Sequence, residues 1–211
     1  RPPRSTLFPY TTLFRSAMAS RVPVEGGESE TASVMAYGFD PFISEKSPWR
    51  GAYLAVVDSI AKLVAAGNGL GNIRLTFQEY FQRMNSQIAW GRPLAALLGA
   101  LEAQLDFGAA AIGGKDSMSG SFESLHVPPT LVSFAVGVCP AKDIVSGEFK
   151  KAGSQIGWLK PVYRDNGTPD PVSQKALFDR VDALIKAGKV LSAYAVGKGG
   201  AAAAADRKSV V

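Results

Sequence analysis

The chain of 211 residues lacks several features that would identify a protein class. It has one cysteine, Cys139, and one histidine, His126, which excludes a disulfide scaffold and argues against a zinc site with several such ligands. Charged residues make up only 19% of the chain, and no apolar run reaches the roughly 18–20 residues of a membrane helix. With 46% hydrophobic residues, the chain is too apolar for a disordered protein and long enough to bury a core.

The net charge of +5 suggests at first an anionic partner such as a nucleic acid. However, residues 6–16 read as the translation of a DNA sequencing adapter, and residues 206–211 read as the translation of its opposite strand. We therefore expect residues 1–16 and 206–211 to be adapter-derived and leave them out of the reasoning about fold. These segments carry four of the five net positive charges. For the insert, residues 17–205, we expect neither a nucleic acid nor a membrane as partner.

The insert alternates between helical and strand patterns, which indicates an α/β (α+β) protein. We expect a linker over 17–35, a first subdomain over 36–145 and the start of a second subdomain over 146–205. The adapter origin of the ends predicts disorder or loose packing over 1–25 and 201–211. The core should therefore exclude the aromatic residues of the first segment, which are Phe8, Tyr10 and Phe14.

Two elements have clear sequence signals. Ser47-Pro48 is typical of a helix start, and Gly67 is typical of the residue after a helix end, so a buried helix is predicted between them. The apolar, β-branched run over 130–138 predicts a strand. Weaker patterns predict short helical character over 77–84, a helix over 94–105 after a break at Arg92-Pro93, a helix over 173–187, and strands over 108–112, 153–160 and 190–196.

The segment with the most chemical content is Gly113 to Ser119, which we expect to be a loop after a strand, open to a cleft. Gly113 and Gly114 would let the backbone approach a ligand closely, and successive N–H groups there can bind an anion. Lys115 supplies a positive charge, and Ser117 and Ser119 are hydrogen-bond donors. Asp116 can ligate Mg²⁺ or accept a hydrogen bond from a substrate. A plain surface turn is the alternative interpretation.

Several other polar residues each have two possible interpretations, one functional and one structural. Asn68 and Asn72 follow the long helix and are either neutral Mg²⁺ ligands or turn residues. Asp58, within the apolar helix, should have a partner or face a cleft. A catalytic pair of Cys139 and His126 competes with a simpler interpretation in which Cys139 packs in the core.

Three segments together resemble phosphoribosylformylglycinamidine synthase, the glutamine-dependent amidotransferase of purine biosynthesis. They are Trp49 to Ser59, Gly67 to Ile73, and the run Gly113-Gly114-Lys115-Asp116-Ser117-Met118-Ser119. The resemblance covers about residues 30–205 and is to the second of two related synthetase halves. It implies an aminoimidazole-ribonucleotide-synthetase-like half with two α/β subdomains, of which the second is incomplete.

The resemblance also implies a reaction. Formylglycinamide ribonucleotide, ATP and glutamine are converted to formylglycinamidine ribonucleotide through an iminophosphate, with Mg²⁺, in the cytoplasm. It assigns catalysis to Lys115, Asp116 and Ser117, and nucleotide or phosphate binding to Gly113, Gly114 and Ser119. Asn72 and Asn68 fall at the metal-ligand positions. The implied partners are a glutaminase domain and the other synthetase half, so this fragment alone should be inactive.

The chain departs from the family pattern at two places. Asn68 stands where the family has a Glu, and Ala195 to Gly200 lacks the Asp and Ser of the corresponding family loop. Two acidic Mg²⁺ ligands are therefore missing. The alternatives to a catalytic half are a silent scaffold half, and a related ATP-dependent synthetase such as aminoimidazole ribonucleotide synthetase or selenophosphate synthetase.

Overall fold

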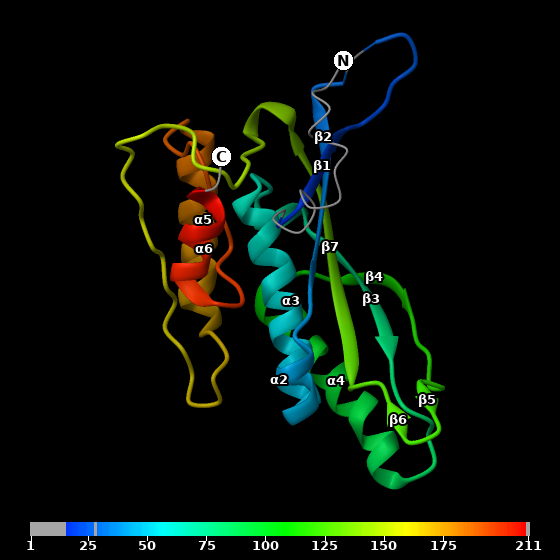
Figure 1. Ribbon diagram of the computed structural model, residues 1–211. Helices are drawn as coiled ribbons and strands as arrows, with labels where there is room; N and C mark the ends of the chain where they lie inside the picture. Colours follow the sequence, from blue (N-terminus) through cyan, green and yellow to red (C-terminus); the bar gives the residue numbers. More distant parts are fainter. Residues whose placement is uncertain (1–15, 28, 210–211) are drawn as a thin grey trace.

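The computed structural model describes residues 16–27 and 29–209, with side chains up to residue 206 (Figure 1). Its centre is a five-stranded sheet in the order β1-β2-β7-β3-β4. These strands are β1 (Met18–Arg21), β2 (Thr31–Gly38), β7 (Thr130–Pro140), β3 (Arg74–Tyr80) and β4 (Ala111–Lys115). All neighbours pair antiparallel except β3 and β4, which are parallel.

One face of the sheet is covered by two long helices, α3 (Pro48–Ala65) and α4 (Gln87–Phe107). A third helix, α5 (Pro171–Lys186), packs outside them and buries Phe178 in the main core. The remaining elements are α2 (Pro41–Lys46), α6 (Gly200–Ser209), a hairpin of β5 (Ser121–Phe122) and β6 (Leu125–His126), and 3₁₀ turns over Leu70–Asn72 and Ala141–Asp143. The layers are therefore sheet, helix pair and outer helix (Figure 1).

The opposite face of the sheet has no helix over it among the described residues. Side chains alternate along β2, so that Val34 is buried under the helices while Met35 and Tyr37 are 47% and 58% exposed. Tyr37 pairs with Phe134 and Met35 with Val136 on β7, and all four side chains lie on this second face by the period of two. We call it the open face of the sheet, and it is largely apolar.

The two clearest sequence predictions are confirmed. The Ser47 hydroxyl accepts a hydrogen bond from the Arg50 N–H at 3.3 Å, Pro48 is the first residue of α3, and Gly67 follows the helix with φ of +104°. A Cβ at Gly67 would lie 1.9 Å from the Asp143 carbonyl oxygen, so the close approach also requires glycine. The predicted strand over 130–138 is β7, and the predicted helix over 173–187 is α5.

In the residues that the structure describes, the ends have more regular secondary structure than expected. The expected linker 17–35 contains β1 and five of the eight residues of β2, and the C-terminal segment forms α6 instead of a disordered end. All four β1 side chains are exposed, however, which agrees with loose packing. The prediction about Phe8, Tyr10 and Phe14 lies outside the described residues. The subdomain boundaries remain predictions.

Three further predictions were wrong, and one helix was confirmed but is longer than predicted. Residues 77–84 are not helical, because β3 ends at Tyr80 and an irregular segment follows. The helix predicted over 94–105 begins at Gln87 and runs through Pro93, because the Ser86 hydroxyl caps it by accepting from the Ala89 N–H at 3.2 Å. The strands predicted over 153–160 and 190–196 do not form. Residues 153–159 are all exposed and pair with no described strand.

Candidate functional site

The predicted site segment begins as a strand and continues as a loop. The strand predicted over 108–112 is β4, which runs from Ala111 to Lys115, so Gly113 and Gly114 belong to an edge strand. The loop proper is 116–120, and it is held at both ends by the residue after β3. The Phe81 N–H donates to the Ser117 carbonyl at 2.8 Å, and the Phe81 carbonyl accepts from the Gly120 N–H at 2.9 Å. This pair of bonds fixes the loop over the end of β3.

The two glycines have different roles. A Cβ on Gly114 would lie 2.4 Å from the Phe77 carbonyl oxygen, so this position needs glycine for the close pairing of β4 with β3. A Cβ on Gly113 would meet nothing within 4 Å. Gly114 is thus explained by the packing of the sheet, and only Gly113 leaves open space for a ligand.

Lys115 is exposed at the end of the edge strand, opposite Gln78 of β3. Its ammonium nitrogen lies 4.1 Å from the centre of the Tyr80 ring. A cation over an aromatic ring keeps its charge, so this contact orients the ammonium group without neutralising it. Within the described chain Lys115 forms no ion pair, which leaves it able to bind an anion.

A buried carboxyl group lies beside the loop. Glu79 on β3 is only 6% exposed, and burial together with the nearby Asp116 carboxylate raises its pKa to about 7. Asp116 itself is exposed. A buried acid next to a candidate catalytic acid is a recognised mark of functional sites. Sequence reasoning missed Glu79 because it assigned 77–84 to a helix; the alternation of Leu75, Phe77 and Glu79 is the signal that could have found it.

The two asparagines proposed as metal ligands do not form one site. Asn68 is fully buried, its side-chain N–H donates to the Gly69 carbonyl at 2.9 Å, and its Oδ1 has no hydrogen-bond partner. Both amide atoms lie 2.6 Å from the position of a Cβ on Gly137, so Asn68 is enclosed against β7. Asn72, by contrast, lines a surface cavity of about 250 Å³ with Asp143, Asp182 and others. Asn68 therefore does not fit an accessible Mg²⁺ site.

The described residues contain no group of three or more His, Cys, Asp or Glu placed to hold a metal ion. The donor set around Asn72 also includes Lys186, whose ammonium donates to the Asp182 carboxylate at 2.6 Å. This lysine already partners the carboxylate that a cation would use. We therefore derive no chemical step through Mg²⁺.

The predicted residues lie at opposite ends of the sheet. Asn72 precedes the first residue of β3, Arg74, whereas Lys115 pairs with Gln78 near the last residue. At about 3.3 Å per residue, Arg74 and Gln78 alone are roughly 13 Å apart along the strand. The structure brings Gly113, Lys115, Asp116 and Ser117 together, and it separates them from Asn68 and Asn72.

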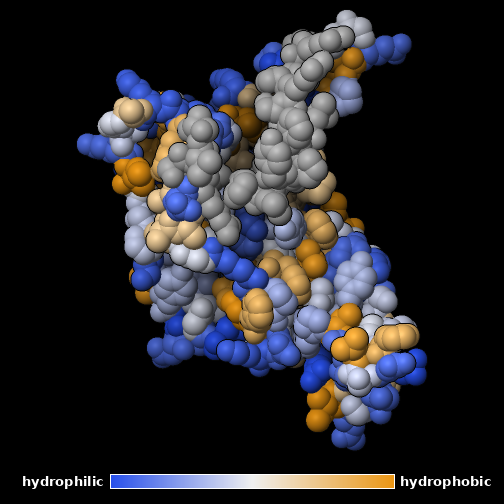
Figure 2. All heavy atoms as spheres, in the orientation of Figure 1, coloured by the Kyte–Doolittle hydropathy of each residue, from blue (hydrophilic) through white to orange (hydrophobic). Residues whose placement is uncertain are grey.

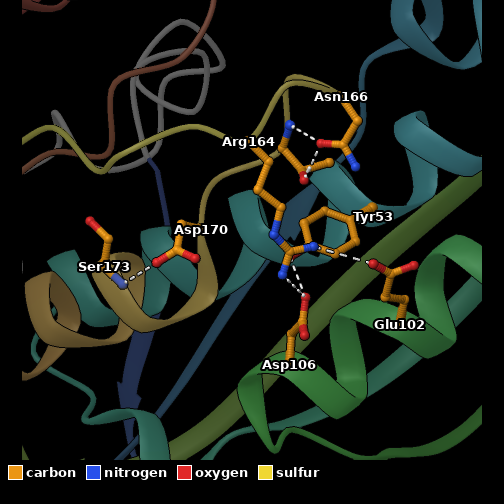
Figure 3. Close-up of polar contacts among 8 residues, drawn as sticks. Tyr53, Glu102, Asp106, Arg164, Asn166, Asp170 and Ser173 are labelled. Atoms are coloured by element: carbon orange, nitrogen blue, oxygen red, sulfur yellow. Dashed lines mark hydrogen bonds and ion pairs between the residues drawn. The ribbon is translucent and has the colours of Figure 1, made fainter.

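A polar cluster connects the C-terminal segment to the helices. The Arg164 guanidinium donates to Glu102 at 3.3 Å and to Asp106 at 3.0 Å, both on α4, and it lies over the Tyr53 ring (Figure 3). The Tyr53 hydroxyl donates to Asp106 at 2.7 Å. Burial and this carboxylate raise the pKa of Tyr53. The cluster anchors the segment before α5 and has a structural role that the sequence did not reveal.

Two other polar residues have structural explanations. Asp58 has the expected partner, because Lys62 donates to it at 2.6 Å, while burial raises the pKa of the Asp58 carboxyl. Cys139 is 8% exposed, and burial raises the pKa of its thiol, so it is the packed cysteine of the simpler interpretation. His126 instead contacts the Ser121 hydroxyl through Nδ1 at 2.8 Å.

No protein-family model matches the sequence, and no curated protein matches it. Solved structures do match. Phosphoribosylformylglycinamidine synthase II from Thermotoga maritima superposes with a TM-score of 0.65 at 16% identity, over 83% of this chain and 27% of that chain. The chain shares the fold of this synthase. The same organism's PurL complexed with AMPPCP gives 0.65 at 15% identity, over the same shares of the two chains.

A third solved structure, T. maritima PurL complexed with FGAR, gives a TM-score of 0.62 at 13% identity over 83% of this chain and 26% of that chain. At these identities the likeness establishes the fold, which is the α/β fold that the sequence resemblance implied. The chain spans little more than a quarter of the length of these synthases. Within the described residues, no helix is long and apolar enough to span a membrane.

Proposed function

We propose that this chain is part of an ATP-dependent ligase that makes formylglycinamidine ribonucleotide from formylglycinamide ribonucleotide, ATP and glutamine. In this reaction the carbonyl oxygen of the glycinamide group attacks the γ-phosphorus of ATP and ADP leaves, while the formyl group is unchanged. Ammonia, released from glutamine elsewhere in the enzyme, then adds to the imidate carbon and phosphate departs. Such chemistry needs positive charge and N–H donors where phosphate oxygens gain charge. We place it in the cytoplasm, as the resemblance implies.

One observation carries the proposal most directly: the last residue of β4 and the loop after it present an unpaired lysine, a carboxylate and a serine together. Lys115 would bind phosphate oxygens of the nucleotide or substrate, the exposed Asp116 would accept a substrate hydrogen bond, and Ser117 would donate one. Gly113, the position with open space, would allow close approach of the ligand, and Ser119 would add a donor. The anchoring by Phe81 means that these groups need little rearrangement on binding.

The remaining groups would come from a second synthetase half. The open face of the sheet carries Met35, Tyr37 and Val138, which are 47%, 58% and 49% exposed. A patch of this kind on a soluble protein is typical of an interaction surface. A second, similar half packed on this face would bring its own residues toward the two separated ends of the sheet, and the site would then be assembled between halves.

A second candidate is a catalytically silent half that only supports the active one. The burial of Asn68 favours it, because the residue at a family metal position is enclosed against Gly137 and replaces an acid. The exposed Lys115 loop favours the catalytic interpretation. The two differ in what happens to synthetase turnover when the loop is changed within the full-length protein.

The experiment for the chain itself is an assay of the 211 residues with ATP, formylglycinamide ribonucleotide and ammonia supplied directly. We expect no multiple turnovers, because the chain holds one half and no glutaminase. Addition of the missing half should restore ATP-dependent product. Multiple turnovers by the chain alone would contradict the claim that the site needs both halves.

A further inference from the structure

An open cavity of about 450 Å³ lies between α2, the start of α4 and the segment that follows β6. Its volume is within the roughly 300–1,000 Å³ of small-molecule sites. Its apolar wall is formed by Phe42, Val127 and three prolines, and its polar groups are Glu45, Gln82, Arg92 and His126. The lining is about evenly polar and apolar, whereas most ligand sites are predominantly apolar, so the polar side chains should dominate recognition here. None of these residues belongs to the Lys115 loop.

Two opposite charges line this cavity without pairing. Arg92 donates through Nη1 to the Gln82 side-chain oxygen at 2.9 Å, which leaves its other N–H groups available. Glu45 is exposed on the last turn of α2. No ion pair joins Arg92 to Glu45, and neither forms one with any other residue in the described chain. A ligand carrying both signs of charge would complement both groups at once.

The apolar residues of the cavity lie on two sides, with Phe42 on one side and Val127 on the other. The Phe42 ring is 69% exposed, and the Lys198 ammonium lies 4.9 Å from its centre. On the other side, the bond between His126 and Ser121 fixes the segment that leads into Val127 and the prolines. Figure 1 shows where β5 and β6 lie. At the same place in Figure 2, hydrophobic residues are exposed on the surface.

We propose that this cavity binds a small zwitterion: an α-amino acid with an apolar side chain. Its carboxylate binds Arg92 and its ammonium group binds Glu45, while its side chain packs between Phe42 and Val127. The cavity adjoins the end of the loop, because the Val127 N–H donates to the Gly120 carbonyl at 2.8 Å, but it shares no residue with the proposed ligase site. Amino-acid binding is therefore measured independently of that function.

The test is binding of L-phenylalanine to the full chain, followed by NMR or calorimetry, with E45Q and R92Q as the variants. Each variant should weaken binding by about fivefold or more, the equivalent of about 1 kcal/mol for a lost ion pair. E25Q and R180Q change the same charges outside the cavity and should bind as the unchanged chain does. Glu45 is exposed, so E45Q tests the idea even if R92Q is poorly folded.

Two analogues of L-phenylalanine, each lacking one of its charged groups, test the two proposed ion pairs one at a time. N-acetyl-L-phenylalanine has no ammonium group, so E45Q should bind it no more weakly than the unchanged chain. L-phenylalaninamide has no carboxylate, so R92Q should bind it no more weakly. Absence of L-phenylalanine binding at about 10 mM, or equal affinity in E45Q and the unchanged chain, would overturn the proposal. Tighter binding of the acetylated analogue than of the amino acid would overturn it too, because the cavity would then be an anion site.

Discussion

The ammonium nitrogen of Lys115 lies 4.1 Å from the centre of the Tyr80 ring, so the exposed charge of the candidate loop is oriented by the last residue of β3. An exposed contact of this kind is worth about 0.5–1 kcal/mol. It limits the freedom of the lysine and leaves its N–H groups for a ligand. The candidate site therefore depends on how β3, β4 and their connecting hydrogen bonds are built.

The two neighbouring glycines of β4 should respond differently to alanine. In Gly114→Ala the new Cβ would lie 2.4 Å from the Phe77 carbonyl oxygen, so we expect a loss of at least about 2 kcal/mol in the free energy of unfolding. Gly113→Ala meets no atom within 4 Å and should change stability by less than about 0.5 kcal/mol. Urea unfolding of both variants checks this, and equal losses would mean that β4 does not pair closely with β3.

Glu79 should make the protein less stable as pH rises. Its pKa in the folded state, about 7, is above the ordinary value of 4.5, so the folded chain holds a proton that the unfolded chain releases. Stability should therefore fall between about pH 4.5 and 7, by up to about 3 kcal/mol, and level off above that range. E79Q should lack this component of the pH dependence, whereas E45Q, which removes an exposed acid, should retain it. Parallel urea titrations at pH 5 and pH 8 measure the difference.

The Arg164 cluster predicts a stability effect at the C-terminal segment. Arg164→Leu removes the cation shared by Glu102 and Asp106, and it leaves the partly buried Asp106 with the Tyr53 hydroxyl as its hydrogen-bond donor. We expect a loss of about 1–3 kcal/mol and faster proteolysis between residues 160 and 187. Arg180→Leu, on the exposed side of α5, is the matched control and should change little. Equal effects of the two variants would assign no anchoring role to the cluster.

The open face of the sheet should make the isolated chain self-associate. Val138→Lys places a charge on the open face, next to Val136 and Met35, and should shift sedimentation toward the monomer. Val172→Lys adds the same charge at a residue that is 74% exposed away from this face, and it should leave the association unchanged. A chain that stays monomeric at all concentrations would show that the open face of the sheet does not drive self-association.

The elements with strong local signals could be predicted from the sequence. Ser47-Pro48 and Gly67 fixed the limits of α3, and the β-branched run of β7 identified the central strand. β3 was missed because Phe77, Tyr80, Phe81 and Met84 also have helical spacing, and only pairing with β7 and β4 selects the strand. The segments 153–160 and 190–196 have strand composition, but a strand needs a paired neighbour, and no described strand pairs with them.

The candidate site was only partly predictable for a related reason. The chemistry of Lys115, Asp116 and Ser117 is local, so their grouping on one loop followed from adjacency. The distance of Asn68 and Asn72 from that loop depends on β3, a strand that the sequence interpretation did not predict. Arg164 and Tyr53 are 111 residues apart along the chain, and no local pattern connects them.

Synthetase turnover of the Lys115→Ala variant in the full-length protein is the most direct test of the central claim. With ammonia supplied, we expect ATP-dependent formation of formylglycinamidine ribonucleotide to fall by about a hundredfold or more, the usual loss when one donor to a developing charge is removed. Glutamine hydrolysis by the glutaminase part should remain measurable, and Lys142→Ala, another exposed lysine, should leave turnover unchanged. Unchanged turnover in Lys115→Ala would contradict the account and reduce the loop to a structural turn.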